Sequence, residues 1–278
     1  DNNLSVTDLK IDPPDNLTEA QLAMWRGYYD PRNQGLDTLS EAELTQWKYN
    51  RYMQDYLRSV KAVDDQVGRV LDYLDASGLA DNTVVIYASD QGWYLGEHGW
   101  YDKRWMYEPS LKTPFMVRWP GVTTPGSRYD GMVSNVDFAP TMLDAAGVTI
   151  PESFQGHSLR TILSTEEASA ATVSVRDDFY YHYYEFPGWH CVRRHYGVRT
   201  ERYKLIYFYG IDEWELFDLQ EDPNEVQSVY GQAAYADIEA DLKERLARLR
   251  AELAVPEDTR PIYGSCEMNG KPILTPDA

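Results

Sequence analysis

The sequence predicts an α/β fold, in which part of a large, mostly parallel sheet flanked by helices precedes a smaller subdomain with an antiparallel sheet and a packed helix. An amphipathic pattern at residues 40–76 runs directly into a strand pattern at residues 83–88, as in half of a βαβ crossover. After residue 172, strand patterns follow one another without intervening helices, which favours an antiparallel sheet. We therefore expect an α/β portion at residues 1–165 and an α+β subdomain at residues 166–278.

Two helices are expected in the first third of the chain. Residues 1–39 are rich in Pro, Asn, Asp and Gly and should be irregular, apart from a short helix that Thr18 caps. Ser40 with Glu43 forms a capping-box pattern, and a long helix should run from there to about Ala76. We expect it to pack on the sheet through an apolar stripe. The stripe comprises Tyr52, Tyr56, Val60, Val63, Val67, Val70, Leu71 and Leu74.

The strand after this helix is a continuous apolar and β-branched run at residues 84–87, which suits a strand covered on both faces, as in parallel sheets. Further strands are expected at residues 115–119 and 131–134. Asp137 is expected to cap a helix at residues 138–146. These elements complete the predicted α/β portion.

The predicted subdomain begins after a polar, alanine-rich linker near residues 164–171. Alternating or apolar patterns predict four strands and a charged amphipathic pattern predicts one helix. The strands are expected at residues 172–175, 197–200, 203–209 and 213–218, and the helix at residues 233–253.

Composition excludes some classes of partner. The chain has 278 residues, 43% of them hydrophobic, and a formal net charge of −19, so it can form a core but should not attract nucleic acid or anionic membranes. No apolar run approaches the length of a membrane span, and the polar amino terminus does not resemble a signal peptide. The spacing of Cys191 and Cys266 leaves open whether they pair.

Polar side chains follow the strand at residues 83–88. Asp90 and Gln91 offer a carboxylate and an amide oxygen, which suit a hard cation, and Lys103 adds a mobile positive charge that suits an oxyanion. Ligands of parallel sheets gather outside the carboxyl ends of the strands. The sequence therefore predicts the chemistry of the chain at this position.

Motifs around these residues resemble the second half-site of the type I, formylglycine-dependent sulfatases, which belong to the alkaline-phosphatase-like superfamily. Order and spacing both match, and the character is that of bacterial glycan sulfatases. The motifs are SDQG at residues 89–92, LGEHG at 95–99, DKRWMYE at 102–108 and TPFMVRWPG at 113–121. The resemblance continues downstream through VSNVDFAPTMLDAAG, QGHSL, RTERYKLIYFY and WELFDLQEDPNE, so it covers most of the chain.

The resemblance implies roles that the residues alone would not. Asp90 alone would be interpreted as a turn residue and Lys103 as a solvated surface lysine. The family implies instead that Asp90 and Gln91 are oxygen ligands of Ca²⁺ and that Lys103 contacts the sulfate oxygens as a catalytic group. For His98 we expect a structural role that fixes the loop, and for Arg104 either a weak substrate contact or an ion pair with a carboxylate.

Residues 180–197 combine three His, two Arg, five Tyr, one Phe and one Trp. One interpretation is a core strand of the subdomain with exposed polar edges. The other is a wall of a sugar pocket, in which rings stack on a pyranose and polar side chains bind its hydroxyl or acidic groups. Under the second interpretation, His195 is the first candidate for substrate binding, followed by Arg194 and His182.

The nucleophile motif of the family is absent from this sequence. Neither cysteine begins the pattern Cys or Ser, x, Pro or Ala, x, Arg, whose first residue becomes formylglycine, and the family's amino-terminal acidic metal ligands and histidines have no counterpart in residues 1–46. We therefore expect the carboxyl-terminal half of a sulfatase, inactive alone and partnered by the missing amino-terminal half. The family implies a bacterial periplasmic or secreted location, although no signal is visible in this chain.

The predicted function is that of a sulfuric ester hydrolase acting on a sulfated carbohydrate. One alternative is a phosphomonoesterase or phosphodiesterase of the same superfamily, because a metal ion and a lysine serve phosphate equally well. Another is a non-catalytic glycan-binding or assembly partner. The sequence leaves open which sugar and which sulfate position are recognised.

Overall fold

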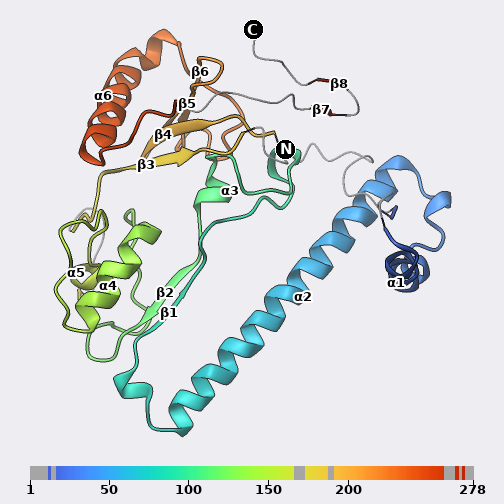
Figure 1. Cartoon of the computed structure of the whole chain (residues 1–278), viewed down its shortest axis with the longest axis horizontal. Helices are drawn as coiled ribbons and strands as arrows, with labels where there is room; N and C mark the ends of the chain where they lie inside the picture. Colours follow the sequence, from blue (N-terminus) through green and yellow to red (C-terminus); the bar gives the residue numbers. More distant parts are fainter. Residues whose placement is uncertain are drawn as a thin grey trace. The chain divides into compact units, whose positions relative to one another are not determined.

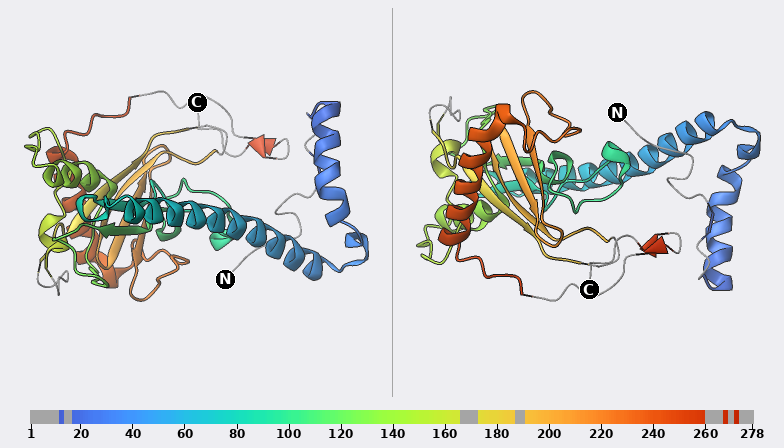
Figure 2. Two further views of the ribbon diagram at one scale, coloured as in Figure 1. Left: turned by 90° about the horizontal axis from the view of Figure 1, so that it is seen from below. Right: turned by 90° about the horizontal axis from the view of Figure 1, so that it is seen from above.

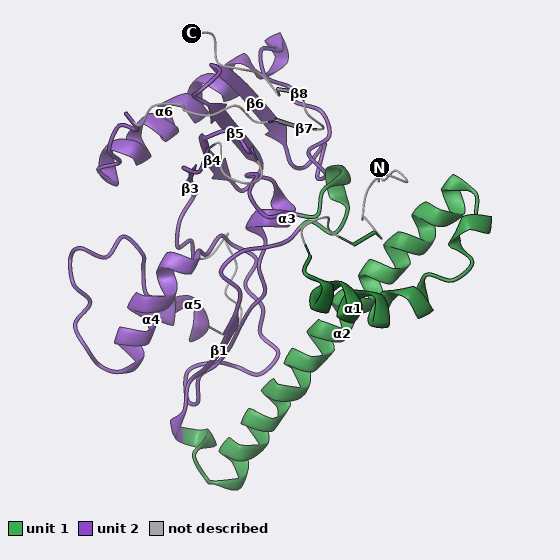
Figure 3. Cartoon of the chain, turned by 45° about the vertical axis from the view of Figure 1, so that its right-hand side comes forward, with its two compact units in different colours: residues 1–81, 94–101 green, residues 82–93, 102–278 purple. Residues whose placement is uncertain are grey.

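The computed structural model describes residues 12–13, 17–165, 173–186 and 191–259, and the backbone of residues 267–268 and 271–272. The chain divides into two compact units, one of residues 1–81 and 94–101, the other of residues 82–93 and 102–278 (Figure 3). The expected boundary between residues 165 and 166 borders a segment outside the described residues, so a boundary there stays a prediction.

Helices dominate the first unit. α1 (Glu19–Tyr29) begins at a capping box formed by Thr18 and Gln21, and α2 (Glu41–Ala76) begins at one formed by Ser40 and Glu43. Both predicted helix starts are confirmed, because each depends on contacts between residues three positions apart. Short 3₁₀ helices complete the unit and the connection to the second one. They are η1 (Asp30–Arg32), η2 (Leu36–Thr38), η3 (Ala80–Asn82) and η4 (Glu97–Gly99).

The apolar stripe of α2 is largely open to solvent. Val60 is 45% exposed and Val70 57% exposed, and of the helix residues, all of which are described, Lys48 alone is buried. The expected packing of this stripe on a sheet therefore stays a prediction. Despite its length, α2 is too charged to cross a membrane, and no other helix among the described residues is long and apolar enough to do so.

The strand that leads to the predicted site is β1 (Val85–Ala88), in the second unit. It pairs with β2 (Phe115–Arg118), with Val85 opposite Arg118 and Ala88 opposite Phe115. This pair is antiparallel, and both strands are half-buried, so the full coverage expected from the apolar run is not observed here. The combination of strands and helices along the chain confirms the predicted α/β class. Every strand pair among the described residues is antiparallel, so the predicted parallel pairing is not observed there.

Short helices follow β1 and β2. They are α3 (Glu108–Leu111), η5 (Asn135–Asp137), α4 (Phe138–Ala145) and α5 (Arg160–Leu163). The strand expected at residues 131–134 is wrong, because Ser134 instead begins a capping box with Asp137 at the start of η5. Asp137 precedes α4 as expected, but its side chain does not cap that helix.

The carboxyl-terminal subdomain contains a four-stranded antiparallel sheet with strands in sequence order. Its strands are β3 (Asp178–Tyr183), β4 (His195–Thr200), β5 (Tyr203–Phe208) and β6 (Glu213–Asp218). The predicted strands in the last three positions are confirmed. The strand expected at residues 172–175 is wrong for residues 173–175, which pack irregularly beside Leu159 and Ile162, whereas Thr172 lies outside the described residues.

One face of this sheet is covered by α6 (Ala236–Glu252), which follows η6 (Ala233–Tyr235) and contacts β3, β4 and β5 (Figures 1 and 2). Leu242, Leu246 and Leu249 of the helix share a core with Val198 and Leu205 of the sheet. The predicted helix packed on the sheet is confirmed, and burial of each such side chain contributes about 1.5–3 kcal/mol.

The other face of the sheet carries the segment that leads into α3. Trp105 stacks on His195 with ring centroids 5.9 Å apart, and Tyr107 meets Phe217 edge to face at 5.6 Å. A Cβ atom at Gly197 would lie 2.3 Å from the carbonyl oxygen of Leu205 and 2.7 Å from the sulfur of Met106, so this position has no room for a side chain. The sheet therefore positions residues 105–108 directly beside the predicted site.

Two short strands, β7 (Glu267–Met268) and β8 (Lys271–Pro272), pair antiparallel near the carboxyl end. Cys191 takes part in a disulfide bond, and Cys266 lies outside the described residues.

Candidate functional site

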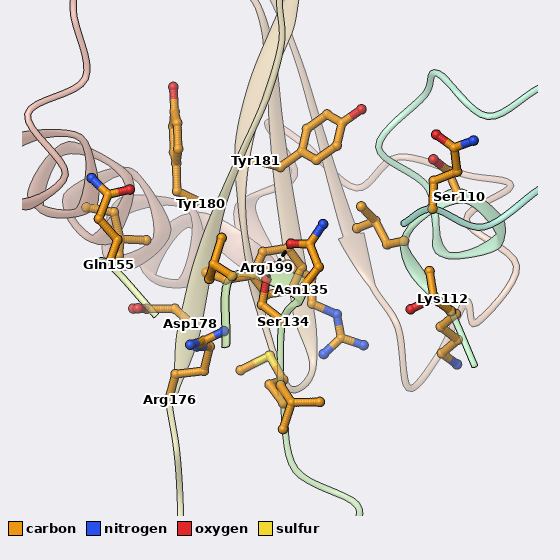
Figure 4. Close-up of a pocket in the computed structure, with 18 of the residues that line it drawn as sticks. Ser110, Lys112, Ser134, Asn135, Gln155, Arg176, Asp178, Tyr180, Tyr181 and Arg199 are labelled. Carbon is orange, nitrogen blue, oxygen red and sulfur yellow. Dashed lines mark hydrogen bonds between the residues drawn. The ribbon is translucent and has the colours of Figure 1, made fainter. Parts of the chain in front are cut away.

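A pocket of about 1340 Å³ lies within the second unit. Its lining includes four of the residues predicted from the sequence: Asp90, Gln91, Lys103 and Arg104. Figure 4 shows Arg199 and Asn135 near the middle of this pocket, with Ser110 and Lys112 on one side and Gln155 and Tyr180 on the other. The structure thus brings together residues from the loop after β1, from the loop before α3 and from the four-stranded sheet.

Local backbone contacts place the oxygen donors in the pocket. Asp90 and Gln91 follow the end of β1, and the N–H of Gly92 donates to the carbonyl of Ser110 at 2.7 Å. A Cβ atom at Gly92 would overlap the carbonyl oxygen of Pro109, so the loop can approach α3 this closely only with glycine.

Lys103 differs from every arginine of the pocket. Among the described residues its ammonium has no hydrogen bond and no ion pair, and the side chains of Asp90 and Gln91 have none either. By contrast, each arginine of the lining pairs with a carboxylate. These pairs are Arg104 with Asp102, Arg176 with Asp137, Arg199 with Glu108, and Arg245 and Arg248 with Asp178. Lys103, the carboxylate of Asp90 and the carboxamide of Gln91 are therefore available to bind a ligand.

The charge of the lining does not by itself favour an anion. Seven basic and eight acidic side chains line the pocket, which leaves one net negative charge. A divalent cation held at Asp90 would reverse that sign and attract an anionic ester. This electrostatic argument favours a cation and an anion that bind together.

The donor chemistry of Asp90 and Gln91 fits a hard cation such as Ca²⁺, which takes six to eight oxygen ligands. No group of three or more His, Cys, Asp or Glu side chains suited to a metal ion occurs in the described part of the chain. These two residues would therefore hold the ion only together with oxygens from elsewhere, such as substrate, water or further protein groups.

A buried charge network supports the pocket wall. Glu108 accepts from Arg199, with 3.1 Å between Oε2 and Nη2, and lies 2.9 Å from Nζ of Lys204. Burial opposes ionisation of Glu108, but the attraction of Lys204 and Arg199 outweighs it and lowers the pKa of this carboxyl to about 2. Lys204 is fully buried and also pairs with Glu225, whose pKa is raised by burial. Ion pairs of the ionised Glu108 therefore fix α3 to the sheet.

Three of the predicted substrate contacts do not line the pocket. His195 is fully buried among the rings of Trp105, Tyr181, Tyr183 and Phe208, and its Nδ1 bonds to the carbonyl of Arg193 at 2.7 Å. Burial lowers the pKa of His195 to about 4.

Arg194 and His182 are likewise held by protein groups. Arg194 is 6% exposed and lies 3.4 Å from the carboxylate of Asp258. His182 bonds Tyr180 at 2.7 Å and Tyr209 at 3.2 Å. These positions agree with the interpretation of this segment as a core strand, and contact of His195, Arg194 or His182 with a sugar stays a prediction.

His98 belongs to the first unit. It adopts a left-handed backbone conformation with φ of 56° and stacks on Trp100 at 5.4 Å between ring centroids.

Arg104 donates to Asp102 and lies 3.6 Å from Glu185. The second of the two roles expected for Arg104, pairing with a carboxylate, is thus observed.

Several residues of the lining escaped the sequence-based prediction. Asn135 and His157 lie in the motifs VSNVDFAPT and QGHSL, which were interpreted only as matches to the family. Arg176 reaches the pocket while it binds the fully buried Asp137, which also accepts from the N–H of His157 at 2.9 Å. The motifs signalled these positions, but only the fold shows that they face one pocket.

Comparison with known families and proteins gives matches along most of the chain. Residues 96–252 match the family model described as N-sulphoglucosamine sulphohydrolase, C-terminal, and residues 17–148 match the model described as Sulfatase. An N-acetylglucosamine-6-O-sulfatase of Bacteroides thetaiotaomicron is 49% identical over 204 residues, which are 73% of this chain and 36% of the relative. An arylsulfatase of Clostridium perfringens is 29% identical, over 86% of this chain and 49% of the relative.

Solved structures show the same similarity. A protein in complex with its substrate D-glucosamine-2-N,6-O-disulfate superimposes with a TM-score of 0.80 and 38% identity, over 92% of this chain and 57% of that protein. A phosphonate monoester hydrolase from Silicibacter pomeroyi has a TM-score of 0.67 and 26% identity, over 79% of this chain and 44% of that protein. The chain thus spans about a third to a half of the curated relatives that it matches.

Proposed function

This chain belongs to the sulfatase family, and from that premise we propose that it carries the calcium- and sulfate-binding side of a site that hydrolyses sulfate esters of carbohydrates. The substrate class that we propose is a sulfated amino sugar. Its support is the similarity to an N-acetylglucosamine-6-O-sulfatase and to a structure bound to a disulfated glucosamine. The function predicted from the sequence is of the same class.

The observation that carries this proposal is the unpaired state of Lys103. Every arginine of the pocket is neutralised by a carboxylate, whereas Lys103, Asp90 and Gln91 have no side-chain partner among the described residues. A point charge and two oxygen donors at one pocket suit a sulfate monoester bound with a cation.

In this proposal each residue has a distinct task. Asp90 and Gln91 would coordinate Ca²⁺ through their side-chain oxygens, and the ion, when bound, would act as a Lewis acid that neutralises charge on the sulfate. The ammonium of Lys103 donates hydrogen bonds to the sulfate oxygens and stabilises negative charge that develops on the departing ester oxygen.

We propose that the nucleophile is supplied from outside this sequence, by an amino-terminal half that completes the site. The support is the absence of a formylglycine motif from the printed sequence, together with the solvent-exposed apolar stripe of α2, including Val60 and Val70. Such an enzyme would work in the bacterial periplasm or outside the cell. Fractionation of the producing cells, followed by detection of this chain in each fraction, tests the location.

The test of catalysis compares the isolated chain with the chain combined with the formylglycine-bearing half of a sulfatase, using N-acetylglucosamine 6-sulfate and release of sulfate as the readout. We expect no turnover by the isolated chain. In the combined enzyme, Lys103→Ala should lower kcat by about 10²–10³-fold, the usual effect of removing one electrostatic group from a transition state.

The control is Lys112→Ala, which removes a lysine that lines the same pocket but is 76% exposed and paired with Glu108. It should leave kcat within about twofold of the unchanged enzyme. Turnover by the isolated chain would refute the need for a second half, and equal effects of the two substitutions would refute the role of Lys103.

A phosphoesterase is the second candidate, favoured by the similarity to a phosphonate monoester hydrolase. A metal ion and a lysine stabilise phosphate as well as sulfate. Side-by-side kcat/KM values for matched aryl sulfate, phosphate and phosphonate esters separate the two activities. A non-catalytic glycan-binding role would show instead as saturable binding of sulfated glycan that Asp90→Ala and Lys103→Ala do not change.

A further inference from the structure

Both loops that carry the proposed ligands are tied to one residue of α3. The carbonyl of Ser110 accepts from the N–H of Gly92 at 2.7 Å, directly after Asp90 and Gln91. The hydroxyl of the same serine donates to the carbonyl of Lys103 at 2.5 Å. Ser110 is 5% exposed, so both bonds are shielded from water.

The contact at Gly92 leaves little freedom. A Cβ atom at this position would overlap the carbonyl oxygen of Pro109 and would lie 2.9 Å from the carbonyl oxygen of Lys112. The loop that contains Asp90 is therefore pressed against α3, and it cannot slide toward α3 without a clash.

α3 is itself anchored to the four-stranded sheet. The N–H of Glu108 donates to the carboxylate of Glu225 at 2.6 Å, and its side chain binds Arg199 and Lys204. These groups are largely or fully buried, and a buried ion pair is strongly destabilised when it loses one partner. The helix therefore offers a fixed reference point for both loops.

The position of Lys103 depends on its contact with α3 more than the positions of the paired arginines do. No carboxylate holds its ammonium among the described residues, so the position of its backbone decides where the flexible side chain begins. The bond from the Ser110 hydroxyl to the Lys103 carbonyl is therefore the direct constraint on this lysine.

We propose that Ser110 is a positioning residue that sets the distance between the Lys103 ammonium and the oxygen donors Asp90 and Gln91. The identity of the ligand between them rests on the proposed function, whereas the constraint rests on the contacts alone. The constraint matters because a displacement of about 1 Å can cost about 10²-fold in rate.

Hydrogen exchange of the full chain tests the constraint without requiring activity. Ser110→Ala removes the hydroxyl donor and should raise amide exchange about 3- to 10-fold in peptides that cover residues 102–106. Residues 89–93 should change less, because the bond from the Gly92 N–H to the Ser110 carbonyl is kept. Exchange in β4 and β5 should stay unchanged. Ser110→Thr keeps the hydroxyl and should restore slower exchange in residues 102–106.

The matched control is Ser158→Ala. Ser158 donates to Asp144 at the same distance of 2.5 Å but does not line the pocket. Ser158→Ala should leave amide exchange in residues 89–93 and 102–106 unchanged. The proposal is overturned if Ser110→Ala leaves exchange in residues 102–106 unchanged, raises exchange equally along the whole chain, or has the same effect as Ser110→Thr.

A second measurement asks whether Ser110 acts through Lys103. When this chain is combined with the formylglycine-bearing half of a sulfatase, Ser110→Ala should lower kcat about 10-fold or more with little change in KM. In a Lys103→Ala background, Ser110→Ala should have no further effect on kcat. Equal losses in both backgrounds overturn the proposal. If no combination releases sulfate, the proposed function fails, and the exchange experiment still decides the role of Ser110.

Discussion

Arg199 holds Glu108 through two guanidinium nitrogens, with Nε 3.2 Å from Oε1 and Nη2 3.1 Å from Oε2. Both residues line the pocket, and the fully buried Lys204 binds the same carboxylate from the sheet. One bidentate pair thus joins the wall of the candidate site to the core of the subdomain.

Lys204→Met should lower the free energy of unfolding of the second unit by about 3–5 kcal/mol, because it leaves Glu108 and Glu225 buried without their shared cation. Urea unfolding measures this loss. Lys112→Met removes an exposed lysine 3.7 Å from the same Glu108 and should cost less than about 1 kcal/mol. Similar losses for the two variants would contradict the importance of burial.

Acid should weaken the same network over a defined range of pH. The pKa of Glu108 falls from 4.5 to about 2 in the folded chain, so its contribution is complete above about pH 4.5 and disappears as the pH falls through about 2. The difference in unfolding free energy between the unchanged chain and Glu108→Gln should therefore be constant at neutral pH and shrink below pH 4.5. A difference that grows on acidification would show that this pKa is not lowered.

His195 should add a second acid-sensitive component at higher pH. Burial lowers its pKa from 6.5 to about 4, so the unfolded chain binds a proton before the folded chain does. Stability should fall as the pH drops from about 6.5 to 4, by up to about 3 kcal/mol. In His195→Phe, chemical unfolding should show a shallower pH dependence in this range. Equal slopes would mean that the imidazole titrates normally.

Two glycine substitutions should have opposite effects on stability. Gly68 lies inside α2, and a Cβ atom there would meet nothing within 4 Å, so Gly68→Ala should stabilise the chain by about 0.5–1 kcal/mol. Gly92→Ala should destabilise it by about 1–3 kcal/mol, because its Cβ would overlap Pro109. Thermal unfolding of both variants checks the signs, and a stabilising Gly92→Ala would refute the close approach to α3.

Features that depend on neighbours along the chain were predictable. Ser40 and Glu43 form their capping box within four residues, so the start of α2 follows from sequence alone. The strands of the antiparallel sheet likewise show in their apolar patterns. Asp137 was expected to cap a helix for the same local reason, yet it binds Arg176, which lies 39 residues away. No local pattern encodes that partner.

In the candidate site, too, local motifs were predictable, whereas contacts between residues distant in the sequence were not. Motifs identified Asp90, Gln91 and Lys103, and the fold places all three at one pocket. The sequence of residues 180–197 offered His195 as a binding group, because His, Tyr and Arg suit both a sugar pocket and a core strand. The choice between these depends on Trp105 and Phe208, which cover the ring from outside the segment.

The exposed valines of α2 have a calorimetric consequence. Unfolding raises the heat capacity mainly in proportion to the apolar surface that becomes newly hydrated. Val60, Val63 and Val70 are already 45–57% hydrated in the folded chain. Melting of this 36-residue helix should therefore contribute a smaller heat-capacity increment, and a smaller urea m-value, than a buried helix of equal length.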